Sequence, residues 1–365
     1  MAARNHPRDT EPAGAGPVPL TERISAELAD FLDRQLAYLH SMSPDLAALG
    51  GAARVAVMDG GKRLRPTFAY WGWRSVRPAG ADGEPALLRA AASLELLQAC
   101  ALVHDDLIDD SGTRRGQSAA HVRFAELAAA EGWPSAPDSF GRAGAVLLGD
   151  LLLSWSEQLF AEASGPLAPG AREQFDLMHT EVVAGQYLDV LAQHRGGFEP
   201  AEALRVIRFK TSKYTVVRPL QLGAGAAGAG PALLAELADY GYALGEAFQL
   251  RDDLLGVFGD PSQTGKPAGD DLREGKRTLL VALAMRAAGP AERQLLRAGV
   301  GDRELSETSV NELRELLVRT GARDAVERRI ADRAAAAVAG LSGAVRPDAR
   351  DALHRLADAA AHRSF

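Results

Sequence analysis

From Leu20 onward, the apolar residues of this chain recur every three to four positions, and this period constrains the fold more than any other feature. Such spacing places apolar side chains along one side of an α-helix. The same stretches are rich in Ala, Leu, Glu and Arg, which favour helices, and runs of alternating β-branched residues are scarce. Breakers such as RPAGADGEP, SGPLAPG and LSGAVRP separate the helical stretches. The pattern predicts a single all-α domain.

The first 19 residues lack this pattern and are rich in Pro, Gly and Ala, without the apolar segment of a signal peptide. We therefore expect a disordered tail at 1–19 and a helical domain at 20–365. No stretch reaches the ~18 uninterrupted apolar residues of a membrane-spanning helix, so no transmembrane segment is expected. The lone cysteine, Cys100, excludes an internal disulfide and fits the cytoplasm. A net charge of −7 argues against a nucleic-acid partner.

An acidic cluster ends one of the most apolar predicted helices, in the segment LVHDDLIDDSGTRRG. On a helix, Asp105 and Asp109 lie one turn apart on the same side, with Asp106 beside them. Carboxylates crowded next to apolar residues repel one another unless a cation neutralises them, and Mg²⁺ prefers oxygen ligands. Arg114 and Arg115 follow directly, and guanidinium groups bind phosphate oxygens in pairs. The segment predicts a metal-bridged diphosphate site.

A second cluster repeats this arrangement near residue 250. Asp252 and Asp253 end another apolar helix, which also carries Gln249. Lys266 and Lys276 follow in the segment GDPSQTGKPAGDDLREGKRT. If the two acidic helix ends face each other, they can hold cations between them while the lysines bind the diphosphate.

With these clusters, the chain resembles the trans-isoprenyl diphosphate synthases. The resemblance covers roughly Leu20 to the C-terminus and includes GGKRLRP at Gly60–Pro66, GQYLDV at Gly185–Val190 and KTSKYT at Lys210–Thr215. It implies an all-α, single-domain antiparallel helical bundle around a deep central cavity, usually a homodimer. It also implies a Mg²⁺-dependent prenyltransferase that joins isopentenyl diphosphate to dimethylallyl, geranyl or farnesyl diphosphate.

The resemblance further implies roles for individual residues. The metal ligands and their supporting acids would be Asp105, Asp106, Asp109, Asp189, Asp252 and Asp253. The isopentenyl diphosphate site would comprise Lys62, Arg65, Gln98 and Arg115. The allylic diphosphate would be held by Arg114, Lys266 and Lys276, and the allylic cation would form beside Lys210, Thr211 and Gln249. Gln186 would face the metals, and Arg363 resembles a tail residue that can cover the isopentenyl site.

Product length in this family depends on the floor of the cavity, one helical turn before the first acidic cluster. Family members that stop at fifteen carbons commonly carry bulky aromatics there. Cys100 and Ala101 occupy this place and are small, which favours geranylgeranyl diphosphate, with twenty carbons. Farnesyl or longer products stay open, because other helices can supply the block.

Three other interpretations compete with this one. A class I terpene cyclase would need an Asn/Ser/Glu motif in place of the second Asp pair. A nucleotide-binding oxidoreductase would use the G-x-G-x-x-G match at Gly223–Gly228, but no strand precedes it, so close helix packing is the better explanation. A non-catalytic partner subunit would have lost aspartates. In its favour, Gly256 stands at the fifth position of the second cluster, where the family usually has Asp.

Overall fold

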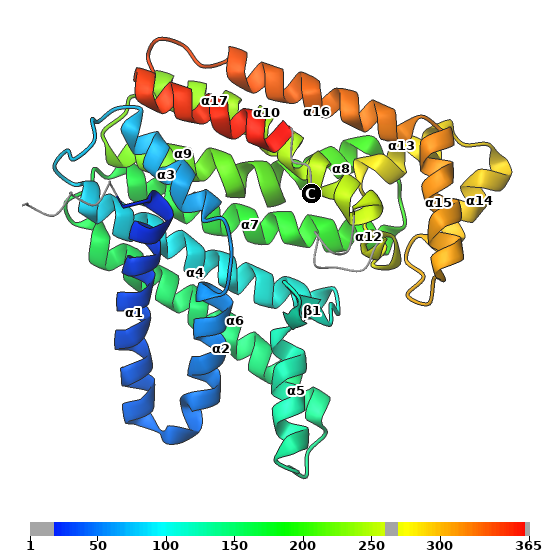
Figure 1. Cartoon of the computed structure of the whole chain (residues 1–365), viewed down its shortest axis with the longest axis horizontal. Helices are drawn as coiled ribbons and strands as arrows, with labels where there is room; N and C mark the ends of the chain where they lie inside the picture. Colours follow the sequence, from blue (N-terminus) through cyan, green and yellow to red (C-terminus); the bar gives the residue numbers. More distant parts are fainter. Residues whose placement is uncertain (1–17, 260–268, 362–365) are drawn as a thin grey trace, which may run out of the picture.

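Helices account for nearly all of the chain that the computed structural model describes, residues 18–259 and 269–361 (Figure 1). Lys266, Arg363 and most of the expected tail at 1–19 lie outside these ranges. The helices are α1 (Leu20–Met42), α2 (Ala47–Met58), α3 (Leu64–Arg74), α4 (Glu84–Ile108), α5 (Ala120–Ala130), α6 (Pro137–Ser164), α7 (Gly170–Arg195), α8 (Pro200–Val206), α9 (Arg218–Ala226), α10 (Pro231–Phe258), α12 (Asp270–Arg273), α13 (Leu279–Ala287), α14 (Pro290–Gly299), α15 (Glu307–Arg319), α16 (Ala322–Ala339) and α17 (Pro347–Ala361). A short 3₁₀ turn, η1 (Pro44–Leu46), and a π-helix, η2 (Ile207–Val217), complete the helical elements. The only strands among the described residues are β1 (Thr113–Arg114) and β2 (Gln117–Ser118), which pair antiparallel.

The predicted all-α fold is confirmed, and the breakers fall between helices as expected. RPAGADGEP connects α3 to α4, SGPLAPG connects α6 to α7, and LSGAVRP connects α16 to α17. Proline stands near the start of α6 and α10, where its missing N–H has no helical partner to lose. Local chain chemistry therefore sets where these helices begin and end.

Helix α4 forms the centre of the molecule. It packs against α6, α3 and α1, and nearly every residue from Leu87 to Cys100 is buried. Among the described residues, α4 alone is long and apolar enough to cross a membrane by length and composition, but 72% of its most apolar window is buried inside the protein. A helix that is apolar on all sides and enclosed by other helices is a core helix of a globular fold.

The π-helix η2 packs against both α7 and α10 and carries Lys210 and Thr211. A π-helix is uncommon and usually marks a functional site. Its neighbour α7 approaches so closely that a Cβ on Gly185 would lie 2.5 Å from the backbone nitrogen of Lys210. Glycine at 185 therefore fixes how deep Lys210 sits between the two helices.

The G-x-G-x-x-G match also packs closely, as the sequence predicted. It begins inside α9, which runs along α3, and a Cβ on Gly223 would lie 1.8 Å from the carbonyl oxygen of Ala69. Since this segment is helical and buried against another helix, it is not a phosphate-binding loop after a strand.

We predict that Gly185→Ala destabilises the protein by about 2 kcal/mol or more, because the added methyl group meets backbone rather than a movable side chain. Turnover should fall as well, since η2 must shift. Gly51→Ala is the matched control: Gly51 lies in α2 with nothing within 4 Å of an added Cβ. That control should be neutral or stabilising by about 0.5–1 kcal/mol. Urea unfolding measures the free energy of unfolding of both variants. Equal changes in Gly185→Ala and Gly51→Ala would contradict the close approach of α7 to η2 at Gly185.

Candidate active site

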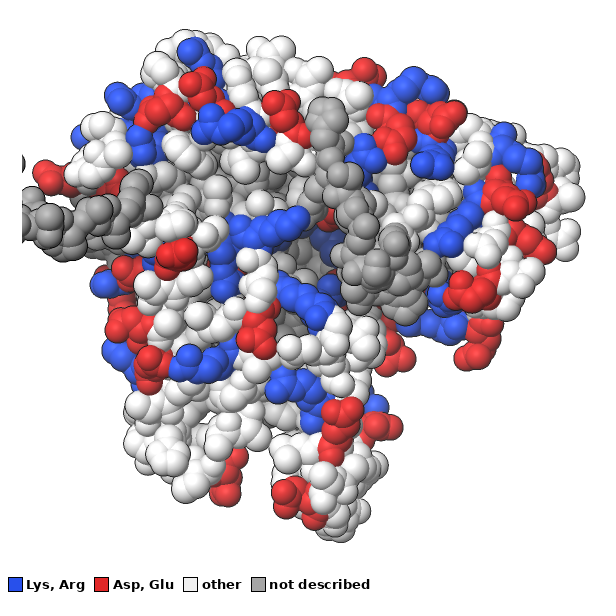
Figure 2. Space-filling model, in the orientation of Figure 1, with Lys and Arg blue, Asp and Glu red and all other residues white. Residues whose placement is uncertain are grey.

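A cavity of about 1350 Å³ lies between α4, α7, η2 and α10. Figure 2 shows Lys and Arg side chains gathered around a hollow near the centre of the face in view. Most residues that the sequence singled out line the cavity. They are Lys62, Arg65, Gln98, Cys100, Ala101, Asp105, Arg114, Arg115, Gln186, Asp189, Lys210, Thr211, Gln249, Asp252, Asp253 and Lys276. Asp106 and Asp109 are buried but do not line it, and Lys266 lies outside the described residues.

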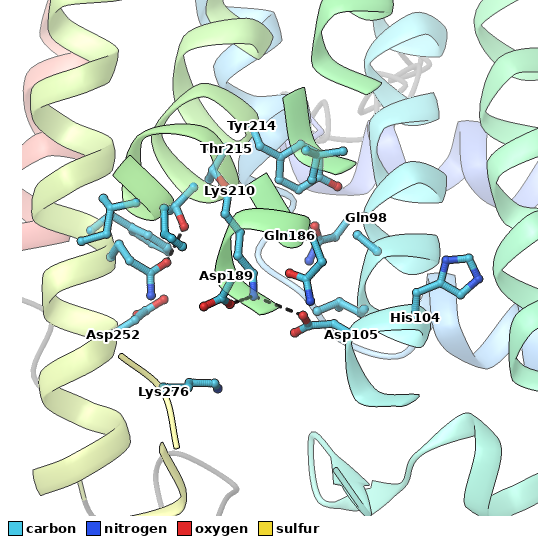
Figure 3. Close-up of a pocket in the computed structure, with 18 of the residues that line it drawn as sticks. Gln98, His104, Asp105, Gln186, Asp189, Lys210, Tyr214, Thr215, Asp252 and Lys276 are labelled. Atoms are coloured by element: carbon cyan, nitrogen blue, oxygen red, sulfur yellow. Dashed lines mark hydrogen bonds and ion pairs between the residues drawn. The ribbon is translucent and has the colours of Figure 1, made fainter. Parts of the chain in front are cut away.

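Acidic residues from α4 and α7 meet at Lys210. Its Nζ donates to Asp189 Oδ2 of α7 at 2.6 Å and to Asp105 Oδ1 of α4 at 3.2 Å. Asp252 of α10 lies on the opposite wall (Figure 3). Burial alone would lower the pKa of Lys210, but Asp189 and Asp105 outweigh it, so the pKa lies above its ordinary value. Lys210 is therefore a fixed positive charge between the walls.

The carboxylates of this site differ in how easily they ionise. Burial would raise the pKa of Asp105, yet Lys210 and Lys276 lower it below its ordinary value. Burial, followed by the charge of Asp105, raises the pKa of Asp109 to about 6. Burial also raises the pKa of Asp253 to about 8. Asp105 therefore ionises more readily than Asp109 or Asp253.

Asp106 turns toward Arg114. The Nε of Arg114 donates to both carboxylate oxygens of Asp106, at 2.9 and 3.1 Å, and its Nη2 donates to the same group. Asp106 is 3% exposed, whereas Arg114 lines the cavity. This geometry suits a supporting role for Asp106, in which it orients a guanidinium that lines the cavity.

A hydrogen-bonded chain runs from η2 to α10. Thr211 Oγ1 donates to Gln249 Oε1 at 2.5 Å, and Gln249 Nε2 donates to Asp253 Oδ1 at 2.8 Å. The chain fixes the amide dipole of Gln249 at the cavity wall. Oriented dipoles of this kind can stabilise a positive charge without reorganising during a reaction.

Basic and polar side chains form a second group near the start of α3. Arg65 Nη2 donates to Thr215 Oγ1 at 2.9 Å, and its guanidinium lies 4.2 Å from the ring centroid of Tyr214. Within the described part of the chain, the buried Nε of Arg65 and the buried Oε1 of Gln98 have no hydrogen-bond partner. Buried polar atoms rarely stay unpaired in a protein, so Arg65 Nε suits an acceptor such as an anionic oxygen, whereas Gln98 Oε1 suits a donor.

Sequence reasoning missed Asp271, which lines the cavity beside Gly256. Its Oδ2 lies 1.8 Å from where a Cβ on Gly256 would stand, and Lys276 Nζ donates to its Oδ1 at 3.0 Å. The carboxylate that the second cluster lacks at position 256 is therefore supplied from α12. The signal was the acidic pair in GKPAGDDLREGK, which lies close to the second cluster in sequence.

The carboxylates that line the cavity fit a divalent cation whose remaining ligands come from a bound substrate and water. Among the described residues, no group of three His, Cys, Asp or Glu side chains could hold a metal ion by itself. Asp105 and Asp252 instead face each other from opposite walls (Figure 3). Mg²⁺ commonly binds through one or two carboxylates, and phosphate oxygens and water complete its shell.

The predicted floor positions also line the cavity. Cys100 and Ala101 are both small, and burial raises the pKa of the Cys100 thiol to about 12. His104 also lines the cavity, and its Nε2 lies 3.2 Å from the carbonyl oxygen of Val146 of α6 (Figure 3). Cys100 is thus a neutral space-filling residue, and His104 joins α4 to α6 at the cavity wall.

Comparison with known proteins points to a single family. The sequence model of the family described as Polyprenyl synthetase matches residues 47–317. Geranylfarnesyl diphosphate synthase of Aeropyrum pernix is 32% identical over 304 residues, 82% of this chain and 88% of that protein. Geranylgeranyl diphosphate synthase of Mycobacterium tuberculosis is 30% identical over 339 residues, 90% of each chain.

Solved structures agree with these sequence matches. Geranylgeranyl pyrophosphate synthase from Corynebacterium glutamicum, complexed with isoprenyl diphosphate and magnesium, superposes with a TM-score of 0.89. It is 38% identical, and the match covers 94% of this chain and 99% of that one. Polyprenyl synthase from Caulobacter crescentus, complexed with calcium and isoprenyl diphosphate, gives a TM-score of 0.77 at 33% identity, covering 95% and 97% of the two chains.

We predict that restoring the missing acid with Gly256→Asp lowers turnover at least about tenfold, equivalent to about 1.4 kcal/mol. A side chain at 256 displaces the Asp271 carboxylate and breaks its bond to Lys276. The double variant Gly256→Asp with Asp271→Gly should recover part of the loss, because the two carboxylates then exchange places. Steady-state rates at saturating metal test this. A fully active Gly256→Asp enzyme would show that Asp271 is not needed where it lies.

A second prediction concerns pH. The pKa values of Asp109 and Asp253 are about 6 and about 8 in the folded protein, against 3.8 in the unfolded chain. Between pH 3.8 and pH 8, the folded protein without metal therefore binds more protons at these two residues than the unfolded chain does. Its free energy of unfolding therefore falls as pH rises from about 4 to 8. Mg²⁺ must displace these protons, so the Mg²⁺-induced rise in Tm should be larger at pH 8 than at pH 6.

Thermal scans with and without Mg²⁺ at both pH values measure this rise, and Asp253→Asn is the control. The amide cannot titrate, so its Mg²⁺-induced shift should change less with pH than that of the wild type. Equal Mg²⁺-induced shifts at pH 6 and pH 8 in the wild type would refute the assignment of these acids.

Proposed function

Because the chain belongs to the polyprenyl synthetase family and is a prenyltransferase, we propose that it makes geranylgeranyl diphosphate. It would condense isopentenyl diphosphate with dimethylallyl, geranyl and farnesyl diphosphate in turn, with Mg²⁺ as its metal. Relatives named as geranylgeranyl, geranylfarnesyl and farnesyl diphosphate synthases support a trans-prenyl diphosphate synthase. Structural neighbours complexed with magnesium or calcium support a divalent cation.

One observation supports the proposal: the two ends of a single cavity are lined by side chains of different charge. At one end, Asp105 and Asp189 accept from Lys210 and Asp252 lies on the opposite wall, so a diphosphate there would need bridging cations. At the other end, Lys62, Arg65 and Arg115 can bind a diphosphate directly. The first site suits the allylic diphosphate, which must leave, and the second suits isopentenyl diphosphate, which keeps its own.

The proposed reaction begins with ionisation of the allylic C–O bond. The bonding electrons go to the departing pyrophosphate, which Arg114, Lys210 and Lys276 help to neutralise. Bound Mg²⁺ would add Lewis-acid charge at the same oxygens. Gln249 and Thr211 present oriented dipoles to the allylic cation. The double bond of isopentenyl diphosphate then forms the new C–C bond, and a proton leaves to the pyrophosphate.

The size of the floor residues supports a twenty-carbon product. Cys100 and Ala101 leave room one turn below Asp105, and Leu153 and His179 line the cavity from α6 and α7. Farnesyl or longer products are the alternatives, since relatives include an octaprenyl synthase. Asp271 beside Gly256 weakens the case for a non-catalytic subunit, because the second acidic site keeps a carboxylate there.

Homodimerisation and a cytoplasmic location belong to the same proposal. Val146 and Leu147 of α6 and Val183 and Tyr187 of α7 are 44–68% exposed although apolar or aromatic. Val183 and Tyr187 also line the cavity. A second copy covering these residues would bury apolar surface. The helical domain at 20–365, with a tail at 1–19, is the proposed domain organisation.

The proposed function predicts the outcome of a product assay. Protein with Mg²⁺, labelled isopentenyl diphosphate and dimethylallyl, geranyl or farnesyl diphosphate should yield a twenty-carbon product from each primer. Chromatography of the dephosphorylated products measures chain length. A fifteen-carbon end product would keep the reaction but reject the floor argument. Folded protein that condenses nothing would favour the partner-subunit alternative, and a cyclic hydrocarbon would favour the cyclase.

Ala101→Phe provides the second prediction. A ring at the cavity wall one turn before Asp105 should stop elongation early and shift the main product to fifteen carbons. Ala99→Phe is not a suitable control because Ala99 is buried in the core. Ala101→Ser is better, since it changes polarity without adding a block. An unchanged twenty-carbon product from Ala101→Phe would show that the growing chain does not pass residue 101.

A further inference from the structure

The segment that precedes α3 contains a buried arginine, Arg63, that the reaction does not use. Lys62 before it and Arg65 after it both line the cavity, but Arg63 does not. Its side chain is 6% exposed and its backbone is left-handed, with φ of 50°. A non-glycine residue in this conformation is strained and persists only where its surroundings hold it.

Three contacts hold the Arg63 guanidinium. Its Nη1 donates to Glu95 Oε2 of α4 at 2.9 Å and to the carbonyl oxygen of Val57 at 2.8 Å. Its Nη2 donates to the carbonyl oxygen of Met58 at 3.4 Å. Val57 and Met58 end α2, where backbone carbonyls lack helical partners and a cation is favourable. Arg63 therefore ties the end of α2 to the middle of α4.

The backbone of Arg63 fixes the start of α3 at the same time. Its carbonyl oxygen accepts from the backbone nitrogen of Thr67 at 3.0 Å and from Thr67 Oγ1 at 2.7 Å. One residue thus joins α2, α3 and α4. The two residues on either side of this junction, Lys62 and Arg65, are cations of the proposed isopentenyl site.

Glu95 sits where these positive charges converge. It is also 6% exposed, and its charge acts on Arg115 as well as on Arg63. Gln98, which lines the cavity, follows three residues later on the same helix. Glu95 pairs with Arg63, which does not line the cavity, so Lys62, Arg65 and Arg115 stay available to bind an anion. The negative charge of Glu95 also reduces the repulsion among these cations.

We propose that the buried Arg63–Glu95 pair is a positioning device for the isopentenyl diphosphate site: it sets the placement of Lys62, Arg65 and Arg115 without touching the substrate. The inference rests on the proposed function, which assigns those three residues to isopentenyl diphosphate. It requires that loss of the pair weakens binding of isopentenyl diphosphate and leaves binding of the allylic substrate, at the acidic end of the cavity, nearly unchanged.

The test compares KM values for the two substrates. Arg63→Met with Glu95→Leu removes both buried charges together, so neither partner is left unpaired and the fold should survive. We expect KM for isopentenyl diphosphate to rise at least tenfold, while KM for farnesyl diphosphate changes less than twofold. Arg63→Lys, which keeps the charge but loses the forked geometry, should give a smaller rise.

The matched control is Arg23→Met with Glu84→Leu. This pair joins α1 to the beginning of α4 at 2.7 Å, and neither residue lines the cavity. It should leave both KM values unchanged. The proposal is overturned if the Arg63/Glu95 variant is folded with an unchanged KM for isopentenyl diphosphate, or if both KM values rise together as Tm falls.

Lys62→Gln separates this outcome from failure of the proposed function. If Lys62→Gln leaves KM for isopentenyl diphosphate unchanged, the assignment of the site is wrong and the inference falls with it. If Lys62→Gln raises that KM and the Arg63/Glu95 variant does not, the site stands and only the positioning role is rejected.

Discussion

Repulsion among carboxylates that must lie close together is the constraint on which the rest of this structure depends. Asp105, Asp189 and Asp252 approach one cavity from three helices, and each is costly to bury as an unpaired charge. The metal-free protein meets this cost with cations from other elements, such as Lys210 of η2 between Asp105 and Asp189. The ion pairs that neutralise the acids therefore also fix the positions of α4, α7 and η2 relative to one another.

This neutralisation depends on backbone packing as much as on charge. Lys210 reaches both acids because η2 lies deep between α7 and α10, and glycine at 185 permits that depth. Asp271 reaches the second acidic cluster because glycine at 256 leaves space for its carboxylate. In both places, a residue without a side chain on one element allows a charged group of another element to enter the site. Electrostatics and steric fit therefore constrain the same positions.

Much of the fold and part of the candidate site could be predicted from the sequence, because local chemistry sets where helices begin and end. The apolar period and the breakers predicted the helices, and helical spacing placed Asp105 and Asp109 one turn apart. The sequence did not reveal that Asp109 and Asp106 are buried off the cavity surface, because orientation depends on neighbouring helices. Contacts such as Asp271 with Gly256 join residues whose proximity only the folded chain defines.

The two ends of the cavity differ in charge. On the proposed function, this difference determines which of the two substrates loses its diphosphate. Near α3, the buried carboxylate Glu95 pairs with Arg63, and Lys62, Arg65 and Arg115 line the cavity, so a diphosphate proposed to bind here would need no added cation. Near Lys210, acids outnumber the lysine that bridges them, so a diphosphate proposed to bind here would need cations, which would also stabilise it as a leaving group. On the proposed function, C–O cleavage is therefore favoured at the acidic end alone, and isopentenyl diphosphate keeps its diphosphate through the reaction.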